Sequence, residues 1–419
     1  MQIRLSQLNY HIGNFEENVR KILGEINSAK ADSVDLIVFP ELSVCGYPPR
    51  DFLEFEDFIL KCERAVSEIA KSCYGITAVV GSPVRNTAKN GKRLYNAALV
   101  LSDGGIKQVV KKTLLPNYDI FDEYRYFEPN REFETTEVNG VKIALTICED
   151  LWNVEDAMYI VSPIDELVKL KPQLMINIAA SPFDFSHRED RIRILSANCK
   201  KYNLPILYSN HVGAQTELIF DGGSMALNAS GDVIHELKYF KEDASTFKFD
   251  KTLSLLEEEQ GAYESSKIER IHDAIVLGIK DYFGKLGFSK AVLGLSGGID
   301  SAVVLYLAQK ALGPENVRTL LMPSGFSSGH SVDDSVELSE NLGTHYEIVS
   351  IEDLFGNFQT DLKPLFGDLP FGLAEENLQA RIRGVLLMAV SNKFGNILLN
   401  TSNKSECSVG YSTIYGDMN

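Results

Sequence analysis

Residues 293–301 read Leu-Gly-Leu-Ser-Gly-Gly-Ile-Asp-Ser, a short apolar run that turns through two glycines into the start of a helix. Two glycines let the backbone come close to an anion, and the N–H groups that open the following helix would face it. The Walker loop G-x-x-x-x-G-K-[ST] is absent, because no lysine follows the glycines. The stretch therefore predicts a phosphate-holding loop that grips another part of a nucleotide. The alternative is a glycine-rich turn that binds nothing.

The residues around this loop predict a parallel nucleotide-binding sheet. We expect strands at 291–295 and 317–322, and helices at 268–283 and 300–311. Strands and helices in this alternation are typical of a doubly wound fold, in which helices cover both faces of the sheet.

The first half of the chain, residues 2–237, alternates β-rich runs with amphipathic segments, which predicts a layered α/β domain. Asn14 is a suitable cap for a helix over 14–30. Further strands are expected at 35–40, 76–81, 95–101, 106–110, 141–147, 174–178 and 206–210, further helices at 54–73, 155–170 and 187–202, and a closing hairpin at 218–237.

Residues 241–267 change in character, since they carry Glu257-Glu258-Glu259 and few strand signals. We therefore expect a first domain at 1–245, a linker at 246–266 and a second domain at 267–419.

Composition narrows the classes of function. The 419 residues are 44% hydrophobic and 24% charged, as in ordinary globular proteins, and the formal net charge is −17. An acidic chain argues against nucleic-acid binding, which needs a basic face. No run is long enough to cross a membrane, and the start lacks the layout of a signal peptide. The six cysteines include no C-x-x-C pair, which fits a reducing cytoplasm.

Three polar residues of the first half stand where predicted strands end, namely Glu41, Lys112 and Cys148. A thiol needs a base to become a nucleophile, and the oxyanion formed by its attack needs a positive partner. Each residue alone has a simpler explanation, as a loop carboxylate, a surface charge or a small core residue. Together they predict a thiol-based catalytic site without a histidine.

The surrounding segments strengthen this interpretation. Phe39-Pro40-Glu41-Leu42, the run from Lys112 to Tyr118, and Ile147-Cys148-Glu149-Asp150-Leu151-Trp152 resemble, in order, the three signature segments of the nitrilase superfamily. The resemblance implies an α-β-β-α layered domain with Cys148 as nucleophile, Glu41 as general base and Lys112 as oxyanion stabiliser. It also implies that the Glu149 N–H is a second oxyanion donor.

The same resemblance implies a glutamine pocket. Its residues would be Tyr118, Glu123 and Ser181, followed by a basic side chain. Members that use glutamine have Lys or Arg six residues after the serine, whereas this chain has His187 and then Arg188. Either one could take the basic role.

The second half resembles the ATP pyrophosphatases through its Ser-Gly-Gly-x-Asp-Ser loop, and NAD synthetase through further segments. These are Met322-Pro323-Ser324, the run 375–383, the run 401–406 and Tyr415-Gly416-Asp417. The whole chain is thus similar to the glutamine-dependent NAD synthetases.

This resemblance implies binding residues for three ligands. Asp300 and Glu406 would hold Mg²⁺, and Asn377, Glu406 and Asp417 would lie near deamido-NAD. The residues implied to bind ATP are Gly294, Leu295, Ser296, Gly297, Gly298, Ile299, Asp300, Ser301 and Thr401.

The family reaction would release ammonia from glutamine at Cys148, adenylate deamido-NAD with ATP at the second site, and give NAD, AMP and pyrophosphate. One alternative is another glutamine-fed ATP pyrophosphatase that amidates a different carboxylate. The family also implies a homo-oligomer. Its members continue beyond the Tyr-Gly-Asp segment, so we expect this chain, which ends at Asn419, to be C-terminally truncated and to make little NAD. A further alternative is a non-synthesising nucleotide-binding remnant.

Overall fold

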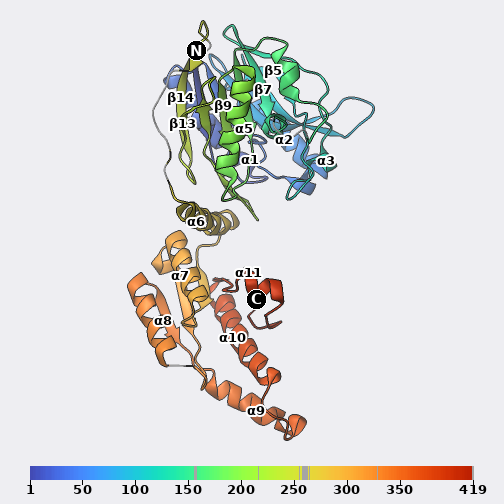
Figure 1. Ribbon diagram of the computed structural model, residues 1–419. Helices are drawn as coiled ribbons and strands as arrows, with labels where there is room; N and C mark the ends of the chain where they lie inside the picture. The colour runs from blue at the N-terminus through green and yellow to red at the C-terminus, as the bar shows by residue number, and fades with distance from the viewer. Residues whose placement is uncertain are drawn as a thin grey trace. The chain divides into compact units, whose positions relative to one another are not determined.

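The computed structural model describes residues 1–154, 158–215, 217–253, 255–256, 263, 265–327 and 329–417 (Figure 1). The chain forms two compact units, Met1–Ala274 and Ile275–Asn419. The three glutamates at 257–259, within the predicted linker, lie outside the described residues.

The first unit contains two main sheets. The seven-stranded sheet has the order β15-β14-β1-β2-β3-β4-β5, and the six-stranded sheet has the order β13-β12-β9-β8-β7-β6. The strands of the first are β1 (Gln2–Gln7), β2 (Leu36–Val38), β3 (Thr77–Arg85), β4 (Leu94–Ser102), β5 (Gly105–Lys111), β14 (Asp243–Asp250) and β15 (Leu255–Leu256). Those of the second are β6 (Thr136–Val138), β7 (Val141–Ile147), β8 (Leu174–Ala179), β9 (Ile206–Asn210), β12 (Met225–Leu227) and β13 (Val233–Glu236).

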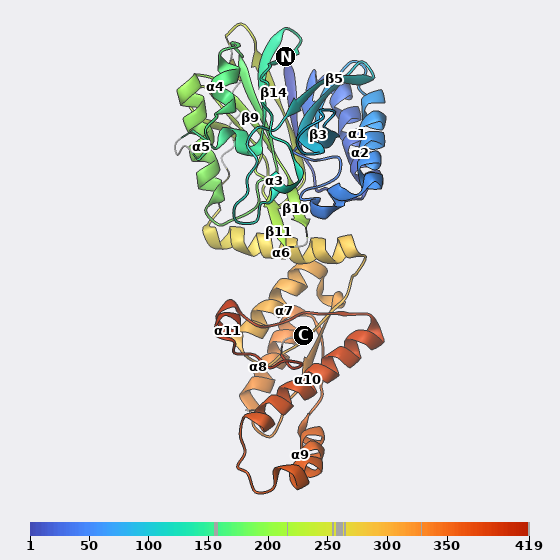
Figure 2. The same cartoon turned by 90° about the vertical axis from the view of Figure 1, so that its right-hand side faces the viewer.

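The two sheets pack face to face, and helices cover their outer faces. Alternation along β2 explains the packing, because Val38 joins the core between the sheets while Ile37 faces the helices α1 (Phe15–Ala31) and α2 (Glu56–Lys71). On the far side, α4 (Pro163–Val168) and α5 (His187–Tyr202) cover the six-stranded sheet (Figure 2). The expected α-β-β-α domain is confirmed.

Most predicted elements of this unit form close to the expected bounds. Asn14 caps α1 as predicted, since its side chain accepts a hydrogen bond from the Glu17 N–H. Strands β7 and β9 and helix α5 match their predicted ranges.

The prediction of a helix over 155–170 is mostly wrong, because α4 spans only six residues and begins at Pro163. Proline fits the first turn of a helix but not its interior, where it removes a hydrogen bond. Residues 155–157 lie outside the described part of the chain.

The predicted linker also needs correction. Strand β14 occupies residues 243–250 and pairs antiparallel with β1, so residues 246–250 belong to the seven-stranded sheet. Phe247 and Phe249 are buried and alternate with exposed Lys248, a strand signal that the acidic character of this region obscured.

The predicted hairpin at 218–237 is formed by β12 and β13 alone. Strand β11 (Leu218–Asp221) pairs instead with β10 (Val212–Gln215).

The second unit is built on a four-stranded parallel sheet with the order β18-β17-β16-β19. The strands are β16 (Ala291–Gly294), β17 (Val317–Leu321), β18 (His345–Ile348) and β19 (Ile397–Leu398). The helices are α6 (Lys267–Leu286), which begins in the first unit, α7 (Ile299–Leu312), α8 (Gly329–Leu342), α9 (Glu352–Phe366), α10 (Leu373–Phe394) and α11 (Lys404–Val409).

Helices cover both faces of this sheet. Leu305 of α7 and Val336 of α8 pack with Leu293, whereas Phe355 of α9 and Ile382 of α10 pack on the opposite side. The expected doubly wound sheet is confirmed. Among the described residues, no helix is long and apolar enough to cross a membrane.

Candidate active sites

A buried lysine joins two carboxylates in the first unit. The Lys112 Nζ lies 2.7 Å from Glu41 Oε1, and 2.8 and 2.9 Å from the two carboxylate oxygens of Glu123. The side chains of Glu41 and Lys112 are fully buried, and that of Glu123 is 6% exposed. Burial works against the charge of Lys112, yet Glu123 and Glu41 raise its pKa well above the ordinary value. Lys112 therefore stays cationic.

Glu41 is held at both carboxylate oxygens. Oε1 also accepts a hydrogen bond of 2.6 Å from Asn96, and Oε2 accepts one of 3.0 Å from the Ala180 N–H. Burial raises the pKa of Glu41, Lys112 opposes this, and Glu123 adds to it. A carboxylate with a raised pKa is a better proton acceptor near neutral pH than an ordinary glutamate.

Cys148 opens a single 3₁₀ turn, Cys148–Leu151, directly after β7. Its φ of +44° lies in a region that L-residues with side chains seldom adopt, so the surrounding contacts must hold the turn. Burial raises the pKa of the Cys148 thiol, the charge of Glu41 raises it further, and that of Lys112 lowers it. The thiol is protonated at rest and needs a base, and both Glu41 and Lys112 are near enough to act on it electrostatically.

Glu149 is a third buried glutamate that acts on the Cys148 thiol, after Glu41 and Glu123. The Tyr118 hydroxyl donates to its two oxygens at 3.0 and 3.1 Å, and the Tyr159 hydroxyl donates to Oε1 at 3.0 Å. Burial raises the pKa of Glu149, while Lys112 and both tyrosines lower it.

The three remaining residues that were predicted to bind glutamine, Ser181, His187 and Arg188, have different hydrogen-bond partners. Ser181 is buried, and its backbone N–H donates to the Asn210 side chain at 2.9 Å. His187 Nδ1 lies 2.9 Å from the Pro182 carbonyl oxygen, and its ring centroid is 6.5 Å from that of Trp152. Arg188 forms a 2.7 Å ion pair with the buried Glu236.

The glycine loop of the second unit follows β16 and leads into α7. The Ser296 and Ser301 hydroxyls lie 3.1 Å apart, the Gly298 N–H donates to Ser296 Oγ, and the Ser301 hydroxyl donates to the Gly298 carbonyl. Gly297 has a φ of +80°, and a Cβ there would lie 2.6 Å from the Ser331 carbonyl oxygen. Glycine is required at this position by both conformation and space.

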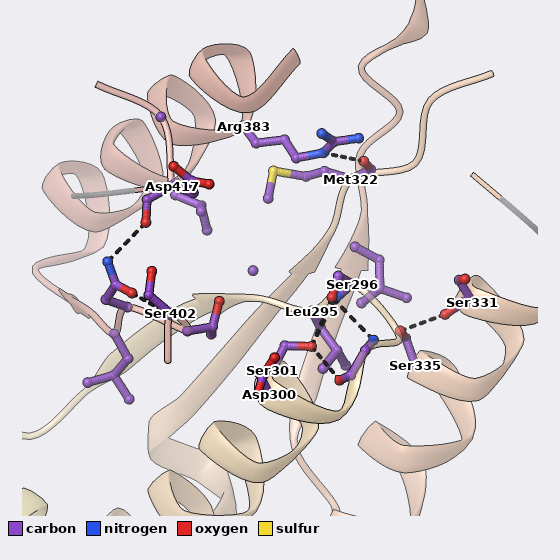
Figure 3. A pocket seen from close by; sticks show the side chains of 18 of the residues that line it. Leu295, Ser296, Asp300, Ser301, Met322, Ser331, Ser335, Arg383, Ser402 and Asp417 are labelled. Atoms are coloured by element: carbon purple, nitrogen blue, oxygen red, sulfur yellow. Dashed lines mark hydrogen bonds between the residues drawn. The ribbon is translucent and has the colours of Figure 1, made fainter. Parts of the chain in front are cut away.

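This loop forms one wall of a cavity of about 490 Å³ (Figure 3). Asp300 and Ser301 lie at one side of it, and Arg383, which donates to the Met322 carbonyl at 3.1 Å, lies at another. Of the nine residues predicted to bind ATP, those that line the cavity are Gly294, Leu295, Ser296, Gly298, Asp300, Ser301 and Thr401; Gly297 and Ile299 are not among its lining residues. Arg383 is the one basic side chain among the described residues of the lining.

Both predicted metal ligands line this cavity. Asn403 connects them, because its amide donates to Asp300 Oδ2 at 3.4 Å and it forms a capping box with Glu406 at the start of α11. Within the described residues there is no group of three acidic, histidine or cysteine side chains that could hold a metal ion. Two carboxylates fit a Mg²⁺ that takes its other ligands from phosphate and water.

Two of the three residues predicted to lie near deamido-NAD, Asn377 and Asp417, contact Thr413. Its hydroxyl donates to Asn377 Oδ1 at 2.9 Å and its backbone N–H donates to Asp417 Oδ1 at 2.5 Å. Asp417 and Glu406 line the cavity, whereas Asn377 is not among its lining residues.

Known proteins match both halves of the chain. Residues 2–255 match the carbon-nitrogen hydrolase family, and residues 271–419 match the NAD synthase family. A glutamine-dependent NAD(+) synthetase from Synechocystis is 44% identical, with 100% of this chain and 76% of that protein covered. One from Thermotoga maritima is 38% identical, with 100% of this chain and 77% of that protein covered.

The chain belongs to the glutamine-dependent NAD(+) synthetases. A solved structure of the synthetase from Acinetobacter baumannii in complex with adenosine diphosphate is 38% identical, with a TM-score of 0.93 over 100% of this chain and 77% of that one. The family resemblance inferred from the motifs is thereby confirmed.

Two residues that contact the buried glutamates of the first unit were not predicted from the sequence. Asn96, in the middle of β4, donates to both Glu41 and Glu123, and Tyr159 donates to Glu149. A buried asparagine within an otherwise apolar strand was the available signal for Asn96. Tyr159 lies in the segment 155–170, which was predicted as a helix, so no signal in the sequence indicated its contact with Glu149.

Proposed function

We propose that the first unit hydrolyses glutamine through a thioester on Cys148. The observation that carries this proposal is the buried Lys112, which bridges Glu41 and Glu123 while acting electrostatically on the Cys148 thiol. The lysine and both carboxylates are held by short hydrogen bonds, so the site is organised before substrate arrives.

In the proposed steps Glu41 transfers the protons and Lys112 stabilises the negative charge. Glu41 accepts the thiol proton as Cys148 attacks the amide carbon, and Lys112 and the Glu149 N–H stabilise the oxyanion. Glu41 then gives its proton to the departing ammonia. In the second half Glu41 takes a proton from a water that attacks the thioester; glutamate leaves, and Glu41 returns the proton to the Cys148 thiolate.

We propose that Tyr118, Glu123 and Ser181 take part in binding glutamine, and that His187 is the basic residue of this pocket. The supporting observation is that Arg188 is already paired with Glu236. The His187 Nδ1–H donates to the Pro182 carbonyl, which leaves Nε2 for another partner.

We propose that the second unit uses ATP to adenylate deamido-NAD and that ammonia displaces AMP to give NAD. The glycine loop supports this, because its backbone N–H groups and the start of α7 suit an anionic leaving group. Asp300 and Glu406 would hold Mg²⁺, whose chemistry when bound is to neutralise phosphate charge. Thr401 would contact ATP, and Asn377 and Asp417 would lie near deamido-NAD.

Product analysis tests both reactions. The chain is incubated with glutamine, ATP, Mg²⁺ and deamido-NAD, while glutamate, pyrophosphate and NAD are measured separately. We expect glutamate release that disappears in Cys148→Ala, and pyrophosphate release that requires deamido-NAD. Pyrophosphate release with another carboxylate, and not with deamido-NAD, would support a different amidotransferase. Absence of glutamate release would refute the first proposal.

We also propose that the protein is a cytoplasmic homo-oligomer, as the family resemblance implies. The free cysteines, of which only Cys407 is exposed among those described, suit a reducing compartment. Light scattering of the purified chain tests the oligomer, and a monomeric mass at micromolar concentration would refute it.

A further inference from the structure

Asp150 is a buried carboxylate that the proposed reaction does not use. It is 3% exposed and accepts three backbone hydrogen bonds. Oδ1 accepts from the N–H groups of Thr113 and Leu114 at 3.0 and 2.8 Å, and Oδ2 accepts from the Ile147 N–H at 3.1 Å. Burial raises the pKa of Asp150 to about 7, and the three N–H donors and the charge of Lys112 act against this rise, although no cation is paired with Asp150 among the described ion pairs.

The donors flank two reacting groups. Thr113 and Leu114 directly follow Lys112, and Ile147 directly precedes Cys148. Lys112 follows β5 in the seven-stranded sheet, whereas Cys148 follows β7 in the six-stranded sheet. The distance between ammonium and thiol therefore depends on how two separate sheets are fixed to each other at this edge.

We propose that Asp150 is the positioning residue that sets the Lys112 ammonium against the Cys148 sulfur. One carboxylate binds the backbone of both segments and thereby ties one sheet to the other beside the reacting atoms. The same bonds hold the strained turn at Cys148, whose φ is +44°. This inference rests on the proposed glutamine hydrolysis, in which Lys112 must reach an oxyanion formed at Cys148.

Asp150→Asn tests the inference with little change in volume. An amide has one acceptor oxygen, so its NH₂ group would face either the Ile147 N–H or the pair from Thr113 and Leu114. The variant therefore loses its hydrogen bonds to one of the two segments that Asp150 connects. Asp35→Asn is a matched control, because Asp35 also bridges the two sheets, accepting from Gln2 N at 2.7 Å and from Asn139 Nδ2 at 2.9 Å. Asp35 precedes β2, at the opposite end from Glu41.

Comparing two reactions of Cys148 distinguishes a misplaced Lys112 from a general loss of structure in the variant. Glutamine hydrolysis needs the oxyanion partner, whereas alkylation by iodoacetamide needs only an accessible, activated thiol. Alkylation is read by mass spectrometry of the Cys148 peptide, because Cys407 is exposed and will also react. Thermal unfolding is recorded for each variant, and Asp150→Glu, which keeps the carboxyl group but is longer, serves if the asparagine variant does not fold.

We expect Asp150→Asn to lower kcat for glutamine about 100-fold with KM nearly unchanged, the scale of a lost oxyanion donor. Alkylation of Cys148 should change by no more than about threefold. Asp35→Asn should leave both rates near wild type. Equal loss of hydrolysis and alkylation, or a kcat within about threefold of wild type, would overturn the inference. Absence of hydrolysis in the wild-type protein would instead refute the proposed function.

Discussion

Lys112→Met should destabilise the first unit in a manner that depends on pH. The substitution keeps an unbranched side chain of similar length but removes the ammonium that makes contacts of 2.7, 2.8 and 2.9 Å with Glu41 and Glu123. Removing one partner of a buried ion pair costs about 3–5 kcal/mol, because the remaining charge is left uncompensated. Here two carboxylates lose their cation, so we expect the upper part of this range at pH 8.

The sign of the pH dependence follows from burial. Burial raises the pKa of Glu41 and Lys112 opposes this, so loss of the lysine raises the pKa of Glu41 further above its value in the unfolded chain. The folded variant then holds a proton that the unfolded chain releases, so its stability is retained at low pH and lost as the pH rises through the raised pKa. The destabilisation should thus be smaller at pH 5.5 than at pH 8.

Urea unfolding followed by tryptophan fluorescence provides the assay. Trp152 is the sole tryptophan and lies in the first unit, so its signal reports on that unit. Lys61→Met is the control, because Lys61 pairs with Asp57 on the surface, where such pairs contribute about 0–1 kcal/mol. A loss below about 1 kcal/mol for Lys112→Met at pH 8, or an equal loss at both pH values, would refute the reasoning.

Three further outcomes are expected. Cys148→Ala should abolish glutamate release while ATP binding, measured by calorimetry, stays within about twofold of wild type, since the thiol serves only the first reaction. Glutamine hydrolysis should fall as the pH drops through the raised pKa of Glu41, because the base works only when deprotonated. Glu41→Gln should lower the rate by about 100-fold or more at every pH. A wild-type rate that does not change between pH 5 and 8, together with a near-normal rate in Glu41→Gln, would exclude Glu41 as the base. Gly297→Ala should weaken ATP binding by about tenfold or more, because its φ is +80° and a Cβ would meet Ser331, whereas Gly284→Ala, where nothing lies within 4 Å, should bind normally.

The sequence predicted those features that depend on short-range pattern. Apolar periodicity located the strand before Cys148 and the helix capped by Asn14, and the two glycines located the turn that leads into α7. Glu41, Lys112 and Cys148 were grouped because each stands where a predicted strand ends and lies in a segment that resembles a nitrilase signature. The hydrogen bond between Lys112 and Glu41 shows that these two side chains meet.

Features that depend on long-range pairing were harder to predict. Strand β14 is a strand because β1, over 230 residues earlier, offers it an edge, and its own acidic neighbours conceal that. The Asn96 contacts and the Asp150 hydrogen bonds likewise join segments far apart in the chain. Local propensity carries no information on such partners, so a buried polar residue in an apolar context is the best available signal.

The number of charges around the thiol has a consequence for turnover. Glu41 and Glu123 contact the Lys112 ammonium in a buried site, and Glu149 is near enough for the lysine to lower its pKa. Under the proposed reaction, a neutral amide enters this pocket and a carboxylate must leave it. The newly formed anion lies among three acidic side chains in a medium that screens poorly, so repulsion favours its departure. If this site hydrolyses glutamine as proposed, we therefore expect little inhibition by its own product, glutamate.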